Sequence, residues 1–531
     1  MALTMGIGLF SGCVSVDTGD SGSGSASETL EKVTTSDQYP IETDVELTWW
    51  VGLNANVAAT AGSMNETEFA RLLQEKTGVK VKFIHPTAGQ ESEQFNLLIA
   101  SGELPDIIET NWSRDAGGPE KAIKDKVILP LNDYIDKVSP NFKKFLEENP
   151  DLDAQLKTDS GKYFMYPMVK KDRQLRSFMG FMVREDLLKR AGLDKPETID
   201  EWEVMLRKFK EMGIKTPLTM SITNDYQELT SLLMGAFGIK GGLYVKDGKV
   251  KFGENEPEYR KFLETMSRWY NEGLLDKEFV DQDAKRLSAM VVNGEVGAII
   301  GYNGADFGKW IPTLEQNVPG ATFTPVAYPT QVKGETPMAG QLANPIDGIG
   351  AVITPSCKHP EIAARLLDFG YSEAGHMLYN FGEEGVSYEM KDGVPTYTDQ
   401  VMDKGKNGGV SINQAIAKYA RSVYSGPFEQ DANYITQVFT LPQQIEAVKL
   451  WSNTKTGDFN MPLISLTAEE TDEYSKIITD INTYREEATA KIISGQMGLD
   501  QIDTYYETLK SMGIDRALEI QQKAYDRFLA R

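Results

Sequence analysis

The chain has 531 residues, which exceeds the usual size of one hydrophobic core, so we expect two or more domains. Its composition, with 40% hydrophobic and 25% charged residues, is that of a globular protein. The 55 basic and 78 acidic residues give a net charge of −23. This charge argues against nucleic acid as a partner, because nucleic-acid binding rests on basic contacts to phosphate.

The first twelve residues, MALTMGIGLFSG, are apolar or small and precede Cys13. The run is too short to span a bilayer and fits the end of a signal peptide. Phe10-Ser11-Gly12-Cys13 resembles a bacterial lipobox, although Leu is more usual than Phe10 and no Lys or Arg precedes the apolar run. We therefore interpret residues 1–12 as a signal-peptide remnant, Cys13 as a lipidation site and residues 13–43 as a flexible tether. The alternative is an irregular N-terminus with a chance cysteine.

Cysteine and histidine are too sparse to indicate a metal site. The only cysteines are Cys13 and Cys357, so a lipid on the first leaves the second without a partner in the chain. The three histidines, His85, His359 and His376, do not pair with one another or with cysteine at ligand spacing. No Asp-x-Asp-x-Asp loop indicates calcium either. We expect no metal and no cofactor.

The first strand is predicted at residues 46–53, which read ELTWWVGL. Trp49 and Trp50 are adjacent and therefore point to opposite faces of a strand. One tryptophan is expected in the core and the other at a ligand cleft. We assign Trp50 to the cleft.

Residues 79–112 predict a strand-helix-strand unit. Apolar and polar residues alternate in VKVKFI, a helical apolar face follows in FNLLIASG, and DIIETNW begins a second strand. Such a unit implies a parallel pair of strands under helices, and ligands bind at the carboxyl ends of these strands. Asn111 and Trp112 are therefore candidate ligand contacts. Trp112 could equally be a core or loop aromatic.

Two arginines stand out in the basic region at residues 168–184. Arg184 ends the apolar strand GFMVR, and Arg173 lies in the run MVKKDRQLR. The planar guanidinium suits carboxylates and vicinal hydroxyls, so Arg184 or Arg173 could hold an acidic sugar. The alternatives are a solvated basic strand and an ion pair that braces a hinge.

A capping box, Thr198-Ile199-Asp200-Glu201, predicts the start of a helix that ends near Gly213. The following stretch holds a strand signal, TPLTMSI, and then a polar break before an apolar helix. Tyr226 lies at this break, where functional loop residues are common.

The second half of the chain offers three more candidate contacts. A buried strand is predicted at residues 298–300, and Tyr302 stands at its carboxyl end, with Trp310 in the loop beyond. Another strand is predicted at residues 349–353. The glycine-bounded loop FGEEG places Glu384 among the candidates. The C-terminal third is expected to be mostly helical.

The order of these segments resembles family 1 of the extracellular solute-binding proteins of bacterial ABC importers. The resemblance is carried by GVKVKFI, SGELPDII, FMVREDLLKRAGLDKPETIDEWEVML, LSAMVVNGEVGAIIGY, IGAVITPSCKHPEIAARLLDF and ALEIQQKAYDRF. It implies an α/β, periplasmic-binding-protein-like (type II) fold in which a hinge joins two lobes around a cleft. The chain would cross near Gly180, Ile349 and Val394. Lobe one would then be residues 44–180 plus 349–394, and lobe two residues 181–348 plus 395–531.

The resemblance also implies a function. The chain would bind a carbohydrate and deliver it to an ABC permease. The chain is most similar to the larger lipoprotein branch of this family, whose ligands are oligosaccharides such as aldouronates. We expect a monomer held by lipid on the outer face of the cytoplasmic membrane. Two alternatives remain: a binding protein for another solute such as a peptide, and a secreted glycoside hydrolase. A hydrolase needs two carboxylates that flank the scissile bond, and the adjacent Glu383 and Glu384 need not converge on one site.

Overall fold

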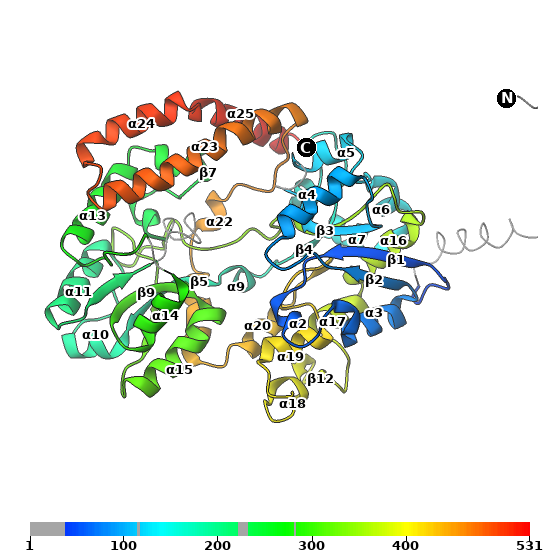
Figure 1. Cartoon of the computed structure of the whole chain (residues 1–531), viewed down its shortest axis with the longest axis horizontal. Coiled ribbons are helices and arrows are strands. Elements are labelled where there is room, and N and C mark those ends of the chain that lie inside the picture. Colours follow the sequence, from blue (N-terminus) through cyan, green and yellow to red (C-terminus); the bar gives the residue numbers. More distant parts are fainter. Residues whose placement is uncertain (1–37, 114–116, 221–231, 281–282) are drawn as a thin grey trace, which may run out of the picture.

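The computed structural model describes residues 38–113, 117–220, 232–280 and 283–531. It has two principal sheets, each with its own core, and these form two lobes side by side (Figure 1). Lobe 1 contains residues 38–169 and 348–438, and lobe 2 contains residues 178–341 and 441–531. The α/β architecture with two lobes is therefore as predicted.

Lobe 1 is built on a six-stranded sheet in the order β14-β4-β11-β3-β1-β2. The predicted strand-helix-strand unit is present as β2, α4 and β3, but β1 lies between the two parallel strands and pairs with both. The elements of lobe 1 are β1 (Glu46–Val51), α2 (Ala55–Ala58), α3 (Glu68–Thr77), β2 (Lys80–Ile84), α4 (Glu91–Ser101), β3 (Ile107–Asn111), α5 (Pro119–Lys124), α6 (Asn132–Val138), α7 (Pro140–Glu148), α8 (Pro150–Gln155), β4 (Tyr166–Val169), β11 (Ile349–Ile353), α16 (Pro360–Asp368), α17 (Glu373–Phe381), β12 (Tyr388–Lys391), β13 (Val394–Tyr397), α18 (Asp399–Met402), α19 (Ile412–Tyr419), β14 (Phe428–Glu429) and α20 (Ala432–Val438).

Lobe 2 is built on a four-stranded sheet in the order β10-β5-β9-β6. The predicted capping box is confirmed: the Thr198 side chain accepts from the Glu201 backbone N–H, and α11 begins there. The elements of lobe 2 are β5 (Met179–Arg184), α10 (Glu185–Ala191), α11 (Ile199–Glu211), β6 (Thr216–Thr219), β7 (Leu243–Lys246), β8 (Lys249–Phe252), α13 (Tyr259–Asn271), α14 (Ala284–Val292), β9 (Val296–Tyr302), the π-helical turn η5 (Asn303–Phe307), α15 (Gly308–Asn317), β10 (Phe323–Val326), α21 (Pro442–Trp451), α22 (Thr456–Phe459), α23 (Ala468–Ile493), α24 (Ile502–Ser511) and α25 (Ile514–Leu529).

The segment 395–430 lies with lobe 1, which differs from the predicted crossing near Val394. Its short strand β14 pairs in parallel with β4 in the large sheet. Phe428 and Ala417 are buried in the core of lobe 1. The chain therefore enters lobe 2 for the last time after α20, because the pairing of β14 holds the preceding helices on lobe 1.

The described chain begins as part of lobe 1 a few residues before the predicted end of the tether. The Tyr39 hydroxyl donates to the backbone oxygen of Arg365 at 2.6 Å, and the Ile41 N–H donates to the backbone oxygen of Thr77 at 2.8 Å. Ile41 is buried in the core of lobe 1. The folded body therefore starts before residue 44, and Cys13 lies outside the described residues.

Cys357 is a buried thiol at the edge of the lobe 1 core, and burial raises its pKa to about 12. Because the thiolate is the reactive form, we expect Cys357 to resist alkylation at pH 8 in the folded protein. Iodoacetamide labelling followed by mass spectrometry checks this, with protein unfolded in urea as the positive control. Labelling at equal rates with and without urea would contradict the burial.

Within the described residues, no helix is both long and apolar enough to cross a membrane. In the same part of the chain, no three His, Cys, Asp or Glu side chains gather where they could hold a metal ion.

Candidate functional site

The two sheets present one edge each to the linkers that join the lobes. One linker leaves the end of β4 at Val169 and enters β5 at Met179; another enters β11 at Ile349. In the sheets, Ile349 lies opposite Asn111, the last residue of β3, and Met179 lies opposite Tyr302, the last residue of β9. Asn111 and Tyr302 therefore stand on the two edges that face each other across the linkers.

The lobe 1 edge is a network of polar groups. The Asn111 amide donates to the backbone oxygen of Asp347 at 3.2 Å, and its carbonyl oxygen accepts from the Ser113 hydroxyl at 2.6 Å. The backbone N–H of Trp112 donates to the backbone oxygen of Gly348 at 2.9 Å. Gly348 has a φ of 89°, and a Cβ there would lie 2.6 Å from the Ser113 hydroxyl oxygen. Only glycine fits this position.

Lys170 and Asp347 add charge to the lobe 1 edge. The Lys170 ammonium lies 3.9 Å from an Asp347 carboxylate oxygen, and both side chains keep part of their surface exposed. Together with Asn111 and Ser113, they place donors and acceptors at the strand ends. Such groups can hydrogen-bond the hydroxyls of a polar solute.

The lobe 2 edge carries an aromatic platform formed by Phe178 and Tyr302. The two rings are stacked with centroids 6.0 Å apart and planes 10° apart, and both side chains are only half-buried. The backbone fixes the pair: the Asn303 N–H donates to the Phe178 carbonyl at 2.8 Å, and the Phe178 N–H donates to the Gln341 side-chain oxygen at 2.7 Å. Flat, partly exposed rings of this kind can stack on a flat ligand.

An irregular turn follows the aromatic platform. β9 runs directly into the π-helical turn Asn303–Phe307, and the Tyr302 N–H donates to the Asp306 carboxylate at 2.9 Å. π-helical turns occur often at functional sites. The turn lies next to the aromatic platform, so both features indicate a functional site at this edge of lobe 2.

The structure does not place three of the predicted aromatic contacts at an accessible rim. Trp112 is fully buried and lies edge-on to Phe95, with ring centroids 5.8 Å apart. Trp50 is 7% exposed and packs against the same phenylalanine, and its neighbour Trp49 is fully buried as well. Trp310 is also buried, and its indole N–H donates to the Ser288 hydroxyl at 3.0 Å. Trp50 and Trp112 are buried under Phe95 of α4, and Trp310 lies in helix α15 rather than in the predicted loop.

Both candidate arginines are engaged by protein groups. Arg184 is buried in lobe 2 and forms a bidentate pair with Asp186, at 2.7 and 2.8 Å. Arg173 lies in the linker helix α9 (Arg173–Arg176) and donates to the backbone oxygens of Ser452 and Thr454. Arg184 is thus paired within lobe 2, and Arg173 fastens the linker to lobe 2 through backbone oxygens rather than through the ion pair that the alternative named.

The last two predicted contacts are Tyr226 and Glu384, of which only Glu384 lies among the described residues. Glu384 is exposed in the loop before β12, and the next residues, Gly385 and Val386, line a separate pocket of about 730 Å³ on the β12–β13 hairpin. Of the seven predicted contacts that lie in the described part of the chain, the structure thus brings Asn111 and Tyr302 to the facing edges.

Sequence reasoning missed Phe178 and Ser113. Phe178 precedes the strand predicted to begin at Gly180. The contact of Phe178 with Tyr302 at the end of β9 therefore could not be predicted. Ser113 lies two residues after Asn111, the last residue of β3. The available signal was that both residues lie within two positions of a strand end.

Comparisons with known proteins identify the family and the fold. The model of the bacterial extracellular solute-binding protein family matches residues 56–377. The fructooligosaccharide ABC transporter substrate-binding protein FusA of Streptococcus pneumoniae serotype 4 (strain ATCC BAA-334 / TIGR4) is 25% identical and aligns over 88% of each chain. Lipoprotein LipO of Bacillus subtilis (strain 168) is 22% identical over 99% of this chain and 97% of its own.

A solved structure shares the fold as well. The alginate-binding protein AlgQ2 superposes with a TM-score of 0.72 at 26% identity, covering 92% of this chain and 99% of its own. The match confirms the expected periplasmic-binding-protein fold. Members of the matched family bind solutes and are not enzymes. The family match spans more than half of the chain, and the chain belongs to the bacterial extracellular solute-binding proteins.

Proposed function

We propose that this protein captures an oligosaccharide between its two lobes and delivers it to the permease of an ABC importer. The observation that carries the proposal is the pairing of two unlike edges. The stacked rings of Phe178 and Tyr302 stand on lobe 2, and the polar groups of Asn111, Ser113 and Asp347 stand on lobe 1. A sugar presents an apolar ring face and a rim of hydroxyls, which suit these two edges. The printed names of FusA and AlgQ2 support this class of ligand.

Neutral oligosaccharides fit the proposal better than acidic ones. Arg184 and Arg173, the two arginines that the sequence offered for a uronate carboxylate, are bound to Asp186 and to backbone oxygens. An exposed carboxylate, Asp347, stands at the lobe 1 edge beside Lys170. The net charge of −23 also disfavours an anionic ligand at a distance.

The proposal places the protein on the outer face of the cytoplasmic membrane. A lipid on Cys13 and the tether after it would hold the two lobes near the permease. The similarity to lipoprotein LipO over nearly the whole chain supports this anchoring.

We expect Tyr302→Ala to weaken binding of a fructooligosaccharide or another neutral oligosaccharide by roughly 10- to 150-fold. Burying an aromatic ring contributes about 1.5–3 kcal/mol, and each 1.4 kcal/mol is tenfold in affinity. Isothermal titration calorimetry checks this with kestose, malto-oligosaccharides, oligogalacturonate and oligoalginate. Tyr302→Phe keeps the ring and should retain most of the affinity.

Tyr270→Ala is the matched control. Tyr270 is another partly buried tyrosine of lobe 2, but it lies near the end of α13, where its ring packs on Phe279. It should bind as the unchanged protein does. No heat with any sugar of the panel would contradict an oligosaccharide ligand. Unchanged affinity of Tyr302→Ala would contradict the aromatic platform as the site.

A further inference from the structure

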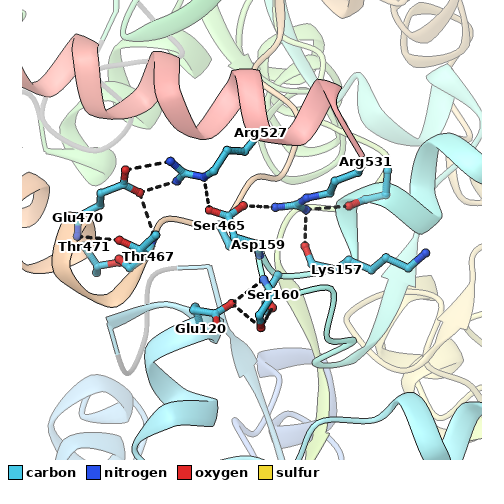
Figure 2. Close-up of polar contacts among 12 residues, drawn as sticks. Glu120, Lys157, Asp159, Ser160, Ser465, Thr467, Glu470, Thr471, Arg527 and Arg531 are labelled. Carbon is cyan, nitrogen blue, oxygen red and sulfur yellow. Dashed lines mark hydrogen bonds and ion pairs between the residues drawn. The ribbon is translucent and has the colours of Figure 1, made fainter.

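A group of ion pairs joins the C-terminal end of lobe 2 to lobe 1, away from the sheet edges. Asp159 lies in the loop between α8 and β4 of lobe 1, and its carboxylate accepts from Arg527 and Arg531, which lie at the end of α25 and just beyond it. Figure 2 shows both guanidinium groups converging on Asp159. We call Asp159, Arg527 and Arg531 the C-terminal clasp.

The two arginines of the clasp make further hydrogen bonds, Arg527 within lobe 2 and Arg531 to lobe 1. Arg527 also binds both carboxylate oxygens of Glu470, in the first turn of α23, and Arg531 donates to the backbone oxygens of Lys157 and Ala154. The Asp159 side chain is 10% exposed and that of Arg531 is 15% exposed. The Asp159–Arg531 pair is therefore shielded from water and stronger than an exposed pair, whose net contribution is close to zero, whereas Arg527 is 34% exposed.

The helices that carry the clasp are fixed to lobe 2. In α23, Ile481, Ile492 and Ile493 are buried in the lobe 2 core, and in α25 Gln522 accepts from the Val250 N–H of β8 at 2.8 Å. The helices α23 and α25 run side by side from lobe 2 toward lobe 1 (Figure 1). At 26 residues, α23 is about 39 Å long, at a rise of about 1.5 Å per residue. The pair therefore forms a stiff strut that is rooted in one lobe and ends on the other.

The start of α23 meets lobe 1 at the same place. The Asp159 N–H donates to the Ser465 hydroxyl at 3.1 Å, the Leu463 N–H donates to the Gln155 side-chain oxygen at 3.0 Å, and Lys124 of α5 pairs with Glu469 at 3.0 Å. Apart from the linkers between the sheets, the lobes are thus joined at the end of a long lever. A rotation of the lobes about the linkers has to move this end relative to Asp159.

We propose that the C-terminal clasp restrains the opening and closing of the two lobes, so that the tail of the chain sets how freely the hinge moves. With the clasp intact, the strut holds lobe 1 in one orientation. When the clasp breaks, the linkers and the weaker contacts at Leu463, Ser465 and Glu469 set the orientation, and the lobes sample a wider range. The ligand-free protein suffices for the test, which is therefore independent of the proposed function.

The test is the distribution of distances between spin labels on the two lobes, measured by pulsed electron resonance on the full chain. Labels are placed at Glu75→Cys in α3 and Glu211→Cys in α11, whose side chains are 67% and 65% exposed. The native thiols are removed by Cys13→Ser and Cys357→Ala. Asp159→Asn should widen the distance distribution, because both arginines lose their charged partner on lobe 1.

Glu473→Gln is the matched control. Glu473 is a carboxylate of α23 that accepts two hydrogen bonds from Arg516 of α25, at 2.8 and 2.7 Å, so the substitution changes the charge equally but leaves lobe 1 untouched. Its distribution should match that of the unchanged protein. Arg531→Ala, which removes one of the two arginines, should give an intermediate width. Equal widths for Asp159→Asn, Glu473→Gln and the unchanged protein would overturn the proposal.

Discussion

Replacing Arg421 by methionine should destabilise the protein by about 3–5 kcal/mol, because it leaves the buried carboxylate of Glu109 without its partner. Arg421 follows α19, and its guanidinium binds both Glu109 oxygens, at 2.8 and 3.0 Å, with both side chains at most 1% exposed. The guanidinium also packs against the rings of Trp49 and Tyr424. Urea denaturation followed by tryptophan fluorescence measures the free energy of unfolding.

A double variant separates loss of the ion pair from loss of packing. Glu109→Leu combined with Arg421→Met replaces both charges by apolar groups and should recover most of the loss, because apolar replacement of a whole buried pair is often neutral. Lys137→Met breaks an exposed pair with Asp133 in the same lobe and should change stability by less than about 1 kcal/mol. If Arg421→Met were as stable as Lys137→Met, the Glu109–Arg421 ion pair would not stabilise lobe 1. Failure of Arg421→Met to fold, with recovery in the double variant, would support this stabilising role.

The Glu109–Arg421 pair also explains why the segment 395–430 belongs to lobe 1. Glu109 lies in the middle of β3, and Arg421 fastens the end of α19 to it. This contact joins residues 312 positions apart, and no local pattern reports it. For this reason the predicted crossing between the lobes near Val394 differs from the observed crossing after α20. A second reason is that β14 has only two residues, so its pairing with lobe 1 could not be predicted.

Local signals predicted the parts of the fold that they control. The strand expected at residues 349–353 is β11, and the strand expected at residues 298–300 lies within β9 (Val296–Tyr302). The capping box at Thr198 forms as the sequence indicates. In each case the apolar periodicity or a capping side chain lies within the element itself, so no distant contact is needed to set it.

The candidate site depended on information that the sequence does not contain. Alternation along β1 shows that Trp49 and Trp50 point to opposite faces, but both rings are buried. The partner of Tyr302 is Phe178, and their contact depends on the register that sets Met179 opposite Tyr302. Strand ends could be located from the sequence, whereas exposure and cross-strand partners could not.

Gly180→Ala should destabilise lobe 2 by about 1–3 kcal/mol, because a methyl group does not fit between β5 and α21. A Cβ at Gly180 would lie 2.3 Å from Cε2 of Trp451 and 2.4 Å from its Cδ2. Trp451 is fully buried, and its indole N–H donates to the Val326 backbone oxygen at 3.0 Å. The ring is held and cannot move aside without losing this hydrogen bond. Thermal unfolding by calorimetry measures the loss.

The same substitution should also weaken ligand binding, because Gly180 lies two residues after Phe178 on β5, and a shift of that strand displaces the aromatic platform. Gly180→Ala with Trp451→Phe should regain part of the stability, since the smaller ring leaves room for the methyl group. Gly52→Ala is the control, because a Cβ there meets nothing within 4 Å, and its stability should be unchanged. If Gly180→Ala were as stable as Gly52→Ala, the close packing of β5 on Trp451 would be refuted, and with it the account of how lobe 2 holds Phe178 against Tyr302.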